Sequence, residues 1–94
     1  MKRRKHRPVA PGEILKADYL EPNGITQREL ADRIEVDIKV VNRIVNGRSA
    51  ISPTVAVKLA YALRTTLDFW LRAQNVSDLY AAEQSIKRYP KALI

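Results

Sequence analysis

The sequence predicts an all-α fold of five helices, with a helix-turn-helix motif at residues 26–47. Apolar residues recur at helical spacing along most of the chain. Residues that favour the position just before a helix stand ahead of four of these runs: Thr26, Asp37, Ser52 and Thr66. No segment predicts a strand, and no repeat or linker divides the 94 residues. We therefore expect an arm at 1–10, one domain at 11–84 and a tail at 85–94.

The first helix is expected over residues 11–20. Pro11 has a φ angle already suited to helix entry, and Glu13 suits the positive end of the helix dipole. The helix should end at Glu21, because a residue that precedes proline is disfavoured in the helical region. Four residues should supply its apolar contacts: Ile14, Leu15, Tyr19 and Leu20.

The second and third helices carry the clearest capping signals. Thr26 and Glu29 have the spacing of a capping box, in which each side chain accepts a hydrogen bond from the other residue's amide. Asp37 suits the N-cap of the third helix, and Gly47 accepts the left-handed conformation that ends it. The inward faces should hold Leu30, Ala31, Ile34, Val41, Ile44 and Val45. The outward face of the third helix would then present Ile38, Lys39, Asn42 and Arg43.

The fourth helix should begin after Ser52, with Pro53 at its first position. Its buried stripe would comprise Val55, Ala56, Leu59, Ala60 and Leu63. The fifth helix is expected over 67–83, and Thr66 is its predicted cap.

The fifth helix carries more apolar residues than one buried stripe needs. We expect Phe69 and Trp70 to close the core over the first and fourth helices. Surplus apolar surface often marks a partner surface. The later part of the helix is therefore the candidate for contact between two subunits, through Val76, Leu79 and Tyr80.

The composition favours a nucleic-acid partner over catalysis. The formal net charge is +7, which in a small domain points first to a polyanion, either nucleic acid or an anionic membrane surface. A basic surface that only keeps the protein soluble is the alternative, and the helix-turn-helix motif, rather than the charge, separates these interpretations. There is no Cys, and the single histidine is His6, so metal sites and acid–base catalysis have few candidate residues. We expect no enzyme activity, no cofactor and no metal. No apolar run reaches the length of a membrane span and no signal peptide is evident, so a cytoplasmic protein is expected.

The first ten residues are expected to form a flexible basic arm, because they are rich in Lys and Arg and offer little to bury. Such an arm either follows DNA phosphates or enters a minor groove, or else it stays solvated and adds only diffuse attraction. The sequence does not separate these alternatives.

Several segments, taken in order, resemble one known family. Residues 26–47 resemble the helix-turn-helix of the Cro/C1 (XRE) repressors. The wider pattern, over about residues 11–83, resembles the HigA antitoxins at Pro11-Gly-Glu-Ile-Leu, Tyr19-Leu-Glu-Pro22, Arg43-Ile-Val-Asn-Gly-Arg48, Ile51-Ser-Pro, Ala56-Val-Lys-Leu-Ala60 and Phe69-Trp-Leu with Gln74 and Asp78-Leu. The resemblance implies a lambda-repressor-like five-helix protein that forms a homodimer on a palindromic operator and represses its own operon. It also implies a toxin partner of the HigB type, a RelE-like ribosome-dependent mRNA endonuclease.

The resemblance further implies a DNA-binding surface, residue by residue. Gln27 matches the position that anchors a phosphate, with a solvated polar residue as the alternative. Arg43 and Asn42 are candidate base contacts, because Arg fits guanine and Asn fits adenine at ~1–3 kcal/mol of discrimination each. A phosphate contact or a salt bridge remains the alternative for Arg43. The other residues assigned to DNA are Arg28, Ile38, Lys39 and Arg48.

The sequence departs from the family at two places in the motif. Glu35 stands in the turn where Gly is usual, and a non-Gly residue in a left-handed turn costs on the order of 1 kcal/mol. Asp37-Ile38-Lys39 replaces a helix start that is usually rich in Ser, Thr and Arg. Other functions stay open: a solitary regulator without a toxin, a protein-interaction module with weak DNA binding, or an RNA-binding protein.

Overall fold

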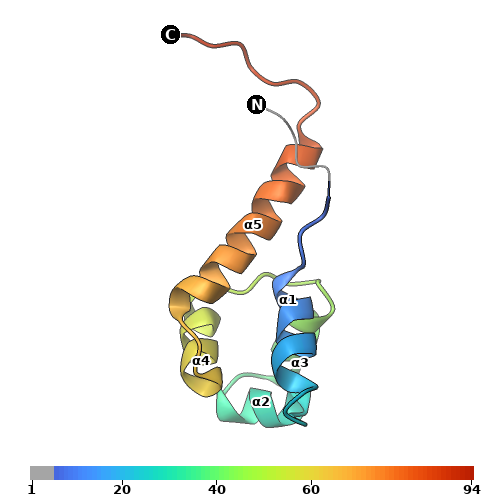
Figure 1. Cartoon of the computed structure of the whole chain (residues 1–94), viewed down its shortest axis with the longest axis vertical. Helices are drawn as coiled ribbons and strands as arrows, with labels where there is room; N and C mark the ends of the chain where they lie inside the picture. The colour runs from blue at the N-terminus through green and yellow to red at the C-terminus, as the bar shows by residue number, and fades with distance from the viewer. Residues whose placement is uncertain (1–5) are drawn as a thin grey trace.

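The computed structural model describes residues 6–94 (Figure 1). Helix α1 (Pro11–Ile14) runs directly into a π-helical segment, η1 (Leu15–Leu20), and together they form the first of five helices. The others are α2 (Gln27–Arg33), α3 (Ile38–Val45), α4 (Pro53–Leu63) and α5 (Leu67–Ser85). None of the described residues lies in a strand. The predicted all-α, five-helix fold is confirmed, and the fifth helix ends at Ser85 rather than at residue 83.

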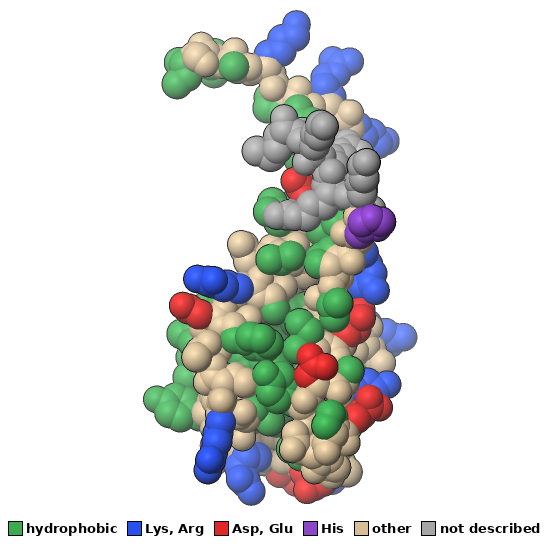
Figure 2. Space-filling model, in the orientation of Figure 1, with side chains coloured by type: hydrophobic (Ala, Val, Ile, Leu, Met, Phe, Trp, Pro, Cys, Tyr) green, Lys and Arg blue, Asp and Glu red, His purple; other side chains and the backbone are tan. Residues whose placement is uncertain are grey.

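The packing of the helices supports α3 from two sides. Helices α2 and α3 pack against each other, α1 packs on α3 and α5, and α4 packs on α5. In Figure 1, α2 lies at one end of the bundle and α5 extends beyond the other helices at the opposite end. Figure 2 shows hydrophobic side chains in the middle of the face between α1 and α4, with Lys and Arg side chains around its edge.

Trp70 is the largest side chain in the core and is fully buried. Its indole Nε1 donates a 2.7 Å hydrogen bond to the Thr65 hydroxyl oxygen, so burial leaves no polar atom of the ring without a partner. The rings of Tyr19 and Phe69 pack against it at centroid distances of 5.5 and 5.0 Å. The prediction that both aromatic residues close the core is right for Trp70 but only partly right for Phe69, which is 39% exposed. The rest of the core comprises Leu15, Leu20, Leu30, Ala31, Ile34, Val41, Ile44, Val45, Ile51, Val55, Ala56 and Leu59.

The first helix changes its winding over the segment that begins at Leu15 and ends at Leu20. Both side chains are buried, and they stand five residues apart. A π-helical turn joins residue i to residue i+5 by a hydrogen bond, which brings residues five apart onto one face. Accordingly, the Glu21 amide donates to the Lys16 carbonyl at 3.0 Å. The predicted regular helix keeps its range but is π-helical from Leu15 onward.

All four predicted N-caps are confirmed. The Thr26 hydroxyl accepts from the Glu29 amide at 3.0 Å, and the Glu29 carboxylate accepts from the Thr26 amide at 3.1 Å. The other caps accept in the same way from an amide two or three residues further on: Asp37 from Lys39, Ser52 from Val55 and Thr66 from Phe69. These bonds satisfy backbone donors that the start of a helix leaves free.

Helix α1 approaches α3 closely at Gly12. This glycine is buried, and a Cβ atom on it would collide with the backbone carbonyl of Ile44 in α3. Glycine allows this approach because it has no side chain. Gly12 thus fixes the start of α1 beside the later part of α3.

Candidate nucleic-acid interface

The turn at residues 34–37 sets the angle between α2 and α3. Glu35 has a left-handed backbone there, with φ of 57°. The amide of Val36 donates to the Ala31 carbonyl at 3.0 Å, which ties the turn back onto α2. The predicted left-handed conformation at a non-Gly residue is therefore confirmed, at a cost of about 1 kcal/mol.

Helix α3 has one buried face and one exposed polar face. The buried face comprises Val41, Ile44 and Val45, as predicted. The exposed face comprises Lys39, Asn42 and Arg43. Ile38 is only half-exposed and packs against the core, so its assignment to the outward face is partly wrong. Helical side chains lean towards the preceding turn, and at the first position of α3 this direction leads Ile38 back towards α2.

A side-chain hydrogen bond joins the start of α2 to the exposed face of α3. The Asn42 Nδ2 donates to the Gln27 Oε1 at 3.2 Å. Gln27 is half-buried and Asn42 is exposed. Within residues 6–94 no hydrogen bond engages the amide nitrogen of Gln27, so this nitrogen can donate to a ligand. Over the same residues Asn42 keeps its own Oδ1 and a second N–H available, one acceptor and one donor side by side.

The basic residues of this surface are free of ion pairs within residues 6–94. They are Arg28, Lys39, Arg43 and Arg48, and all four are exposed. Arg48 follows Gly47, whose φ of 72° ends α3, and its amide donates to the Arg43 carbonyl at 2.8 Å. The salt-bridge alternative for Arg43 is therefore not found in the described chain, and an incoming phosphate or base would have no ion pair to break.

Two contacts near this surface were not predicted from the sequence. The Asn42–Gln27 bond joins residues 15 apart, and the Arg7–Glu13 ion pair joins the segment before α1 to its first turn at 2.9 Å. Neither spacing is a helical neighbour spacing, so no periodic pattern indicates them. Asn46, exposed just after α3, was also not singled out, although it lies one turn beyond Arg43.

The three residues predicted for subunit contact lie in the C-terminal half of α5. Val76 is 38% exposed and Leu79 is 42% exposed, while Tyr80 is half-buried. The surface is therefore apolar and accessible, as a contact between subunits requires, and the assignment stays a prediction.

Residues 6–94 contain no group of three or more His, Cys, Asp or Glu side chains that could hold a metal ion. No helix in that range is long and apolar enough to cross a membrane.

A short helix held by a preceding helix through a tight turn, with polar side chains along its exposed face, defines the helix-turn-helix class. Comparison with known families agrees, because the helix-turn-helix family model matches residues 17–70. The chain is 45% identical over 80 residues to Antitoxin HigA-1 of Vibrio cholerae serotype O1. The match covers 85% of this chain and 75% of that protein. The chain therefore belongs to the HigA-type antitoxins of the XRE helix-turn-helix family.

Two further relatives bear on the site. The structure of the Pseudomonas aeruginosa antitoxin HigA with the higBA promoter is similar at a TM-score of 0.83, with 33% identity, and the match covers 94% of this chain and 100% of that one. The chain is also 34% identical over 87 residues to the uncharacterized HTH-type transcriptional regulator YbaQ of Escherichia coli K12, covering 93% of this chain and 77% of that protein.

Proposed function

We propose that the protein is a sequence-specific DNA-binding repressor, that it acts as an antitoxin, and that it represses its own operon. The observation that carries the DNA-binding part of this proposal is the Asn42–Gln27 hydrogen bond, which joins polar side chains at the start of α2 and on the exposed face of α3. The relative from P. aeruginosa supports it, because that structure contains the antitoxin HigA with the higBA promoter. The antitoxin part rests on the family membership.

Three residues would hold the DNA backbone. Gln27 would donate its free amide nitrogen to a phosphate, since its oxygen is already bonded to Asn42. Arg28, near the start of the motif, and Arg48, just after its end, would contribute charged donors. The backbone amide of Arg48 is bonded to the Arg43 carbonyl. These contacts orient the protein without selecting a sequence.

The exposed face of α3 would read the bases in the major groove. The free guanidinium of Arg43 fits the two acceptors of guanine, and the donor–acceptor pair left on Asn42 fits adenine. Lys39 would reach a guanine or a phosphate, and the half-exposed Ile38 would contact a thymine methyl group at most at its edge.

The protein would bind a palindromic operator as a homodimer. One helix-turn-helix reads a short half-site, and two-fold dimers place two such motifs about 34 Å apart. We assign the dimer contact to Val76, Leu79 and Tyr80 on α5, which are apolar and accessible.

The second proposed partner is a HigB-like, RelE-type toxin, which the family membership supports. A protein that binds an operator and a toxin of this kind would act in the cytoplasm, on nucleoid DNA. We propose no catalytic role and no cofactor for the chain.

A solitary transcriptional regulator without a toxin is the second candidate, and the similarity to YbaQ favours it. The two candidates differ in the neighbouring gene. Coexpression with the product of an adjacent small reading frame should yield a stable complex if the protein is an antitoxin. No complex, together with unchanged operator binding, would support the solitary regulator.

The DNA-reading role is tested by the substitution Arg43→Ala. Removing a base contact of this kind costs ~1–3 kcal/mol in each subunit, so affinity for the sequence upstream of the protein's own gene should fall at least about tenfold. Affinity for a scrambled duplex should fall much less. Fluorescence anisotropy with both duplexes measures the two constants.

Arg33→Ala is the matched control, because it removes the same charge from the end of α2, beside hollows lined by α4. It should change both affinities little. Equal binding by Arg43→Ala and the native protein, on both duplexes, would show that α3 does not read this DNA.

A further inference from the structure

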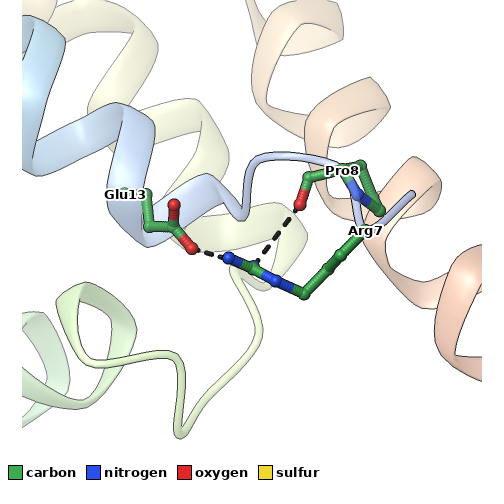
Figure 3. A network of polar contacts seen from close by, with 3 residues as sticks. All are labelled: Arg7, Pro8 and Glu13. Atoms are coloured by element: carbon green, nitrogen blue, oxygen red, sulfur yellow. Dashed lines mark hydrogen bonds and ion pairs between the residues drawn. The ribbon is translucent and has the colours of Figure 1, made fainter.

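Arg7 lies outside the helix-turn-helix motif and is held in place by Glu13. Its Nη1 donates to the Glu13 carboxylate at 2.9 Å and approaches the Pro8 carbonyl at 3.4 Å (Figure 3). Glu13 stands in α1, and α1 is fixed against α3 by the close approach at Gly12. Arg7 therefore has a defined position relative to α3.

That position is beside the end of α3. Arg7 and Glu13 line a hollow of about 500 Å³ together with Asn46 and Gly47. Asn46 is exposed and continues the exposed stripe of α3, since residues 39, 43 and 46 recur at helical spacing. A second hollow shares Gly47 and is lined by Arg48. Two arginines thus flank the same end of the surface that we propose to face DNA.

The side chain of Arg7 can bind an anion without leaving Glu13. A guanidinium has five N–H donors in a planar fork, and within residues 6–94 only the Nη1 of Arg7 is engaged. Its Nε and Nη2 remain available for a phosphate, whose oxygens match this fork. Both partners of the ion pair are well exposed, so the pair itself is weak and serves mainly to orient the guanidinium.

We propose that Arg7 binds a DNA phosphate at the edge of the interface, next to the bases that α3 faces, and that Glu13 is its positioning residue. This inference rests on the proposed function. It assigns a fixed contact with the DNA backbone to Arg7, near the end of the basic arm that adjoins α1. The sequence alone left two alternatives for this arm, a direct contact with DNA and a diffuse attraction to it.

Salt dependence of DNA binding tests the contact. A plot of log affinity against log salt loses about 0.9 in slope for each phosphate contact removed. Arg7→Ala should therefore reduce the slope by about 0.9 per subunit on the native upstream duplex and on a scrambled duplex, and weaken both by a similar factor. Arg7→Lys should keep the slope, because the charge remains, and lose part of the affinity, because the fork is lost.

Arg33→Ala is again the matched control, since it also removes one positive charge. If Arg7→Ala and Arg33→Ala give the same slope, the attraction of Arg7 is diffuse and the contact is wrong. If the native protein binds neither duplex, the proposed function itself fails. Circular dichroism and melting temperature confirm that each variant is folded.

The role of Glu13 is tested by a double-mutant cycle. If Glu13 acts by orienting Arg7, Glu13→Gln should weaken DNA binding about threefold more in the native background than in Arg7→Ala, as a surface pair of ordinary strength allows. An equal effect in both backgrounds would show that Glu13 does not position Arg7. A purely structural role for Glu13 would change the melting temperature alike in both backgrounds and leave this ratio at one.

Discussion

Glu35 holds a left-handed backbone in the turn between α2 and α3, and its side chain is exposed. A residue with a Cβ atom pays about 1 kcal/mol for this conformation, whereas glycine adopts it freely. The carboxylate also places negative charge in the motif that we propose to bind DNA, where like charges repel. The backbone strain at Glu35 therefore predicts an effect of substitution on stability, and its charge predicts an effect on DNA binding.

Glu35→Gly should stabilise the protein by about 0.5–1 kcal/mol. It relieves the strained backbone, and the greater conformational entropy of glycine in the unfolded chain offsets part of this gain. For a domain of this size that is a rise of roughly 2–8 °C in melting temperature. Glu35→Ala is the control: it removes the same charge but keeps the strain. A melting temperature raised equally by both variants would show that charge, rather than backbone strain, is responsible.

Residue-level features that depend on near neighbours in the chain were predictable. Each N-cap bonds an amide two or three residues away, so Thr26 and Asp37 could be assigned from local spacing alone. The exposure of Phe69 was not predictable, because it and Trp70 are adjacent aromatic residues and only the packing of the helices shows which ring is buried.

At the scale of elements, the sequence predicted where helices begin and end but not how they join. The Asn42–Gln27 bond spans 15 residues and depends on the crossing of α2 and α3. The bond between Ile51 and Gln74 spans 23 residues and depends on how the loop after α3 meets α5. The candidate base contacts could be assigned from motif position, whereas the bonds that orient them required the fold.

Gln74 links α5 to the loop that carries Arg48. Its Oε1 accepts from the Ile51 amide at 2.8 Å, and its Nε2 donates to Asp78 at 2.8 Å. Gln74→Ala would leave the amide of a buried residue without a partner, at about 1–3 kcal/mol. Urea denaturation should show that loss, and hydrogen exchange at the Ile51 amide should be faster.

Asn75→Ala is the control for Gln74, since Asn75 is the adjacent exposed amide side chain on the same helix. It should leave both stability and exchange at Ile51 near the native values. Unchanged exchange in Gln74→Ala would mean that the loop is held by other contacts.

At the scale of the whole molecule, the later turns of α5 extend beyond the other helices (Figure 1). Its first turns bury Trp70 against the core, whereas Val76 and Leu79 in its later turns stay 38% and 42% exposed. A second copy that packed on this half, as proposed above, would bury the apolar surface. Operator binding by two half-sites would then depend on this contact.

Leu79→Asp should therefore weaken operator binding without altering the DNA-reading surface. A buried unpaired carboxylate in a subunit contact is strongly unfavourable. If the proposed dimer forms through Leu79, light scattering should show that the variant is monomeric at concentrations where the native protein dimerises. Affinity for the full operator should fall at least about tenfold, while affinity for a single half-site should stay the same.

Leu67→Asp is the control, because it makes the same change at a residue that is 39% exposed in the first turn of α5. It should leave the proposed dimer intact. If Leu79→Asp still forms a dimer, the subunit contact lies on another surface. If the variant loses affinity for a single half-site as well as for the full operator, α5 supports the fold of the motif instead.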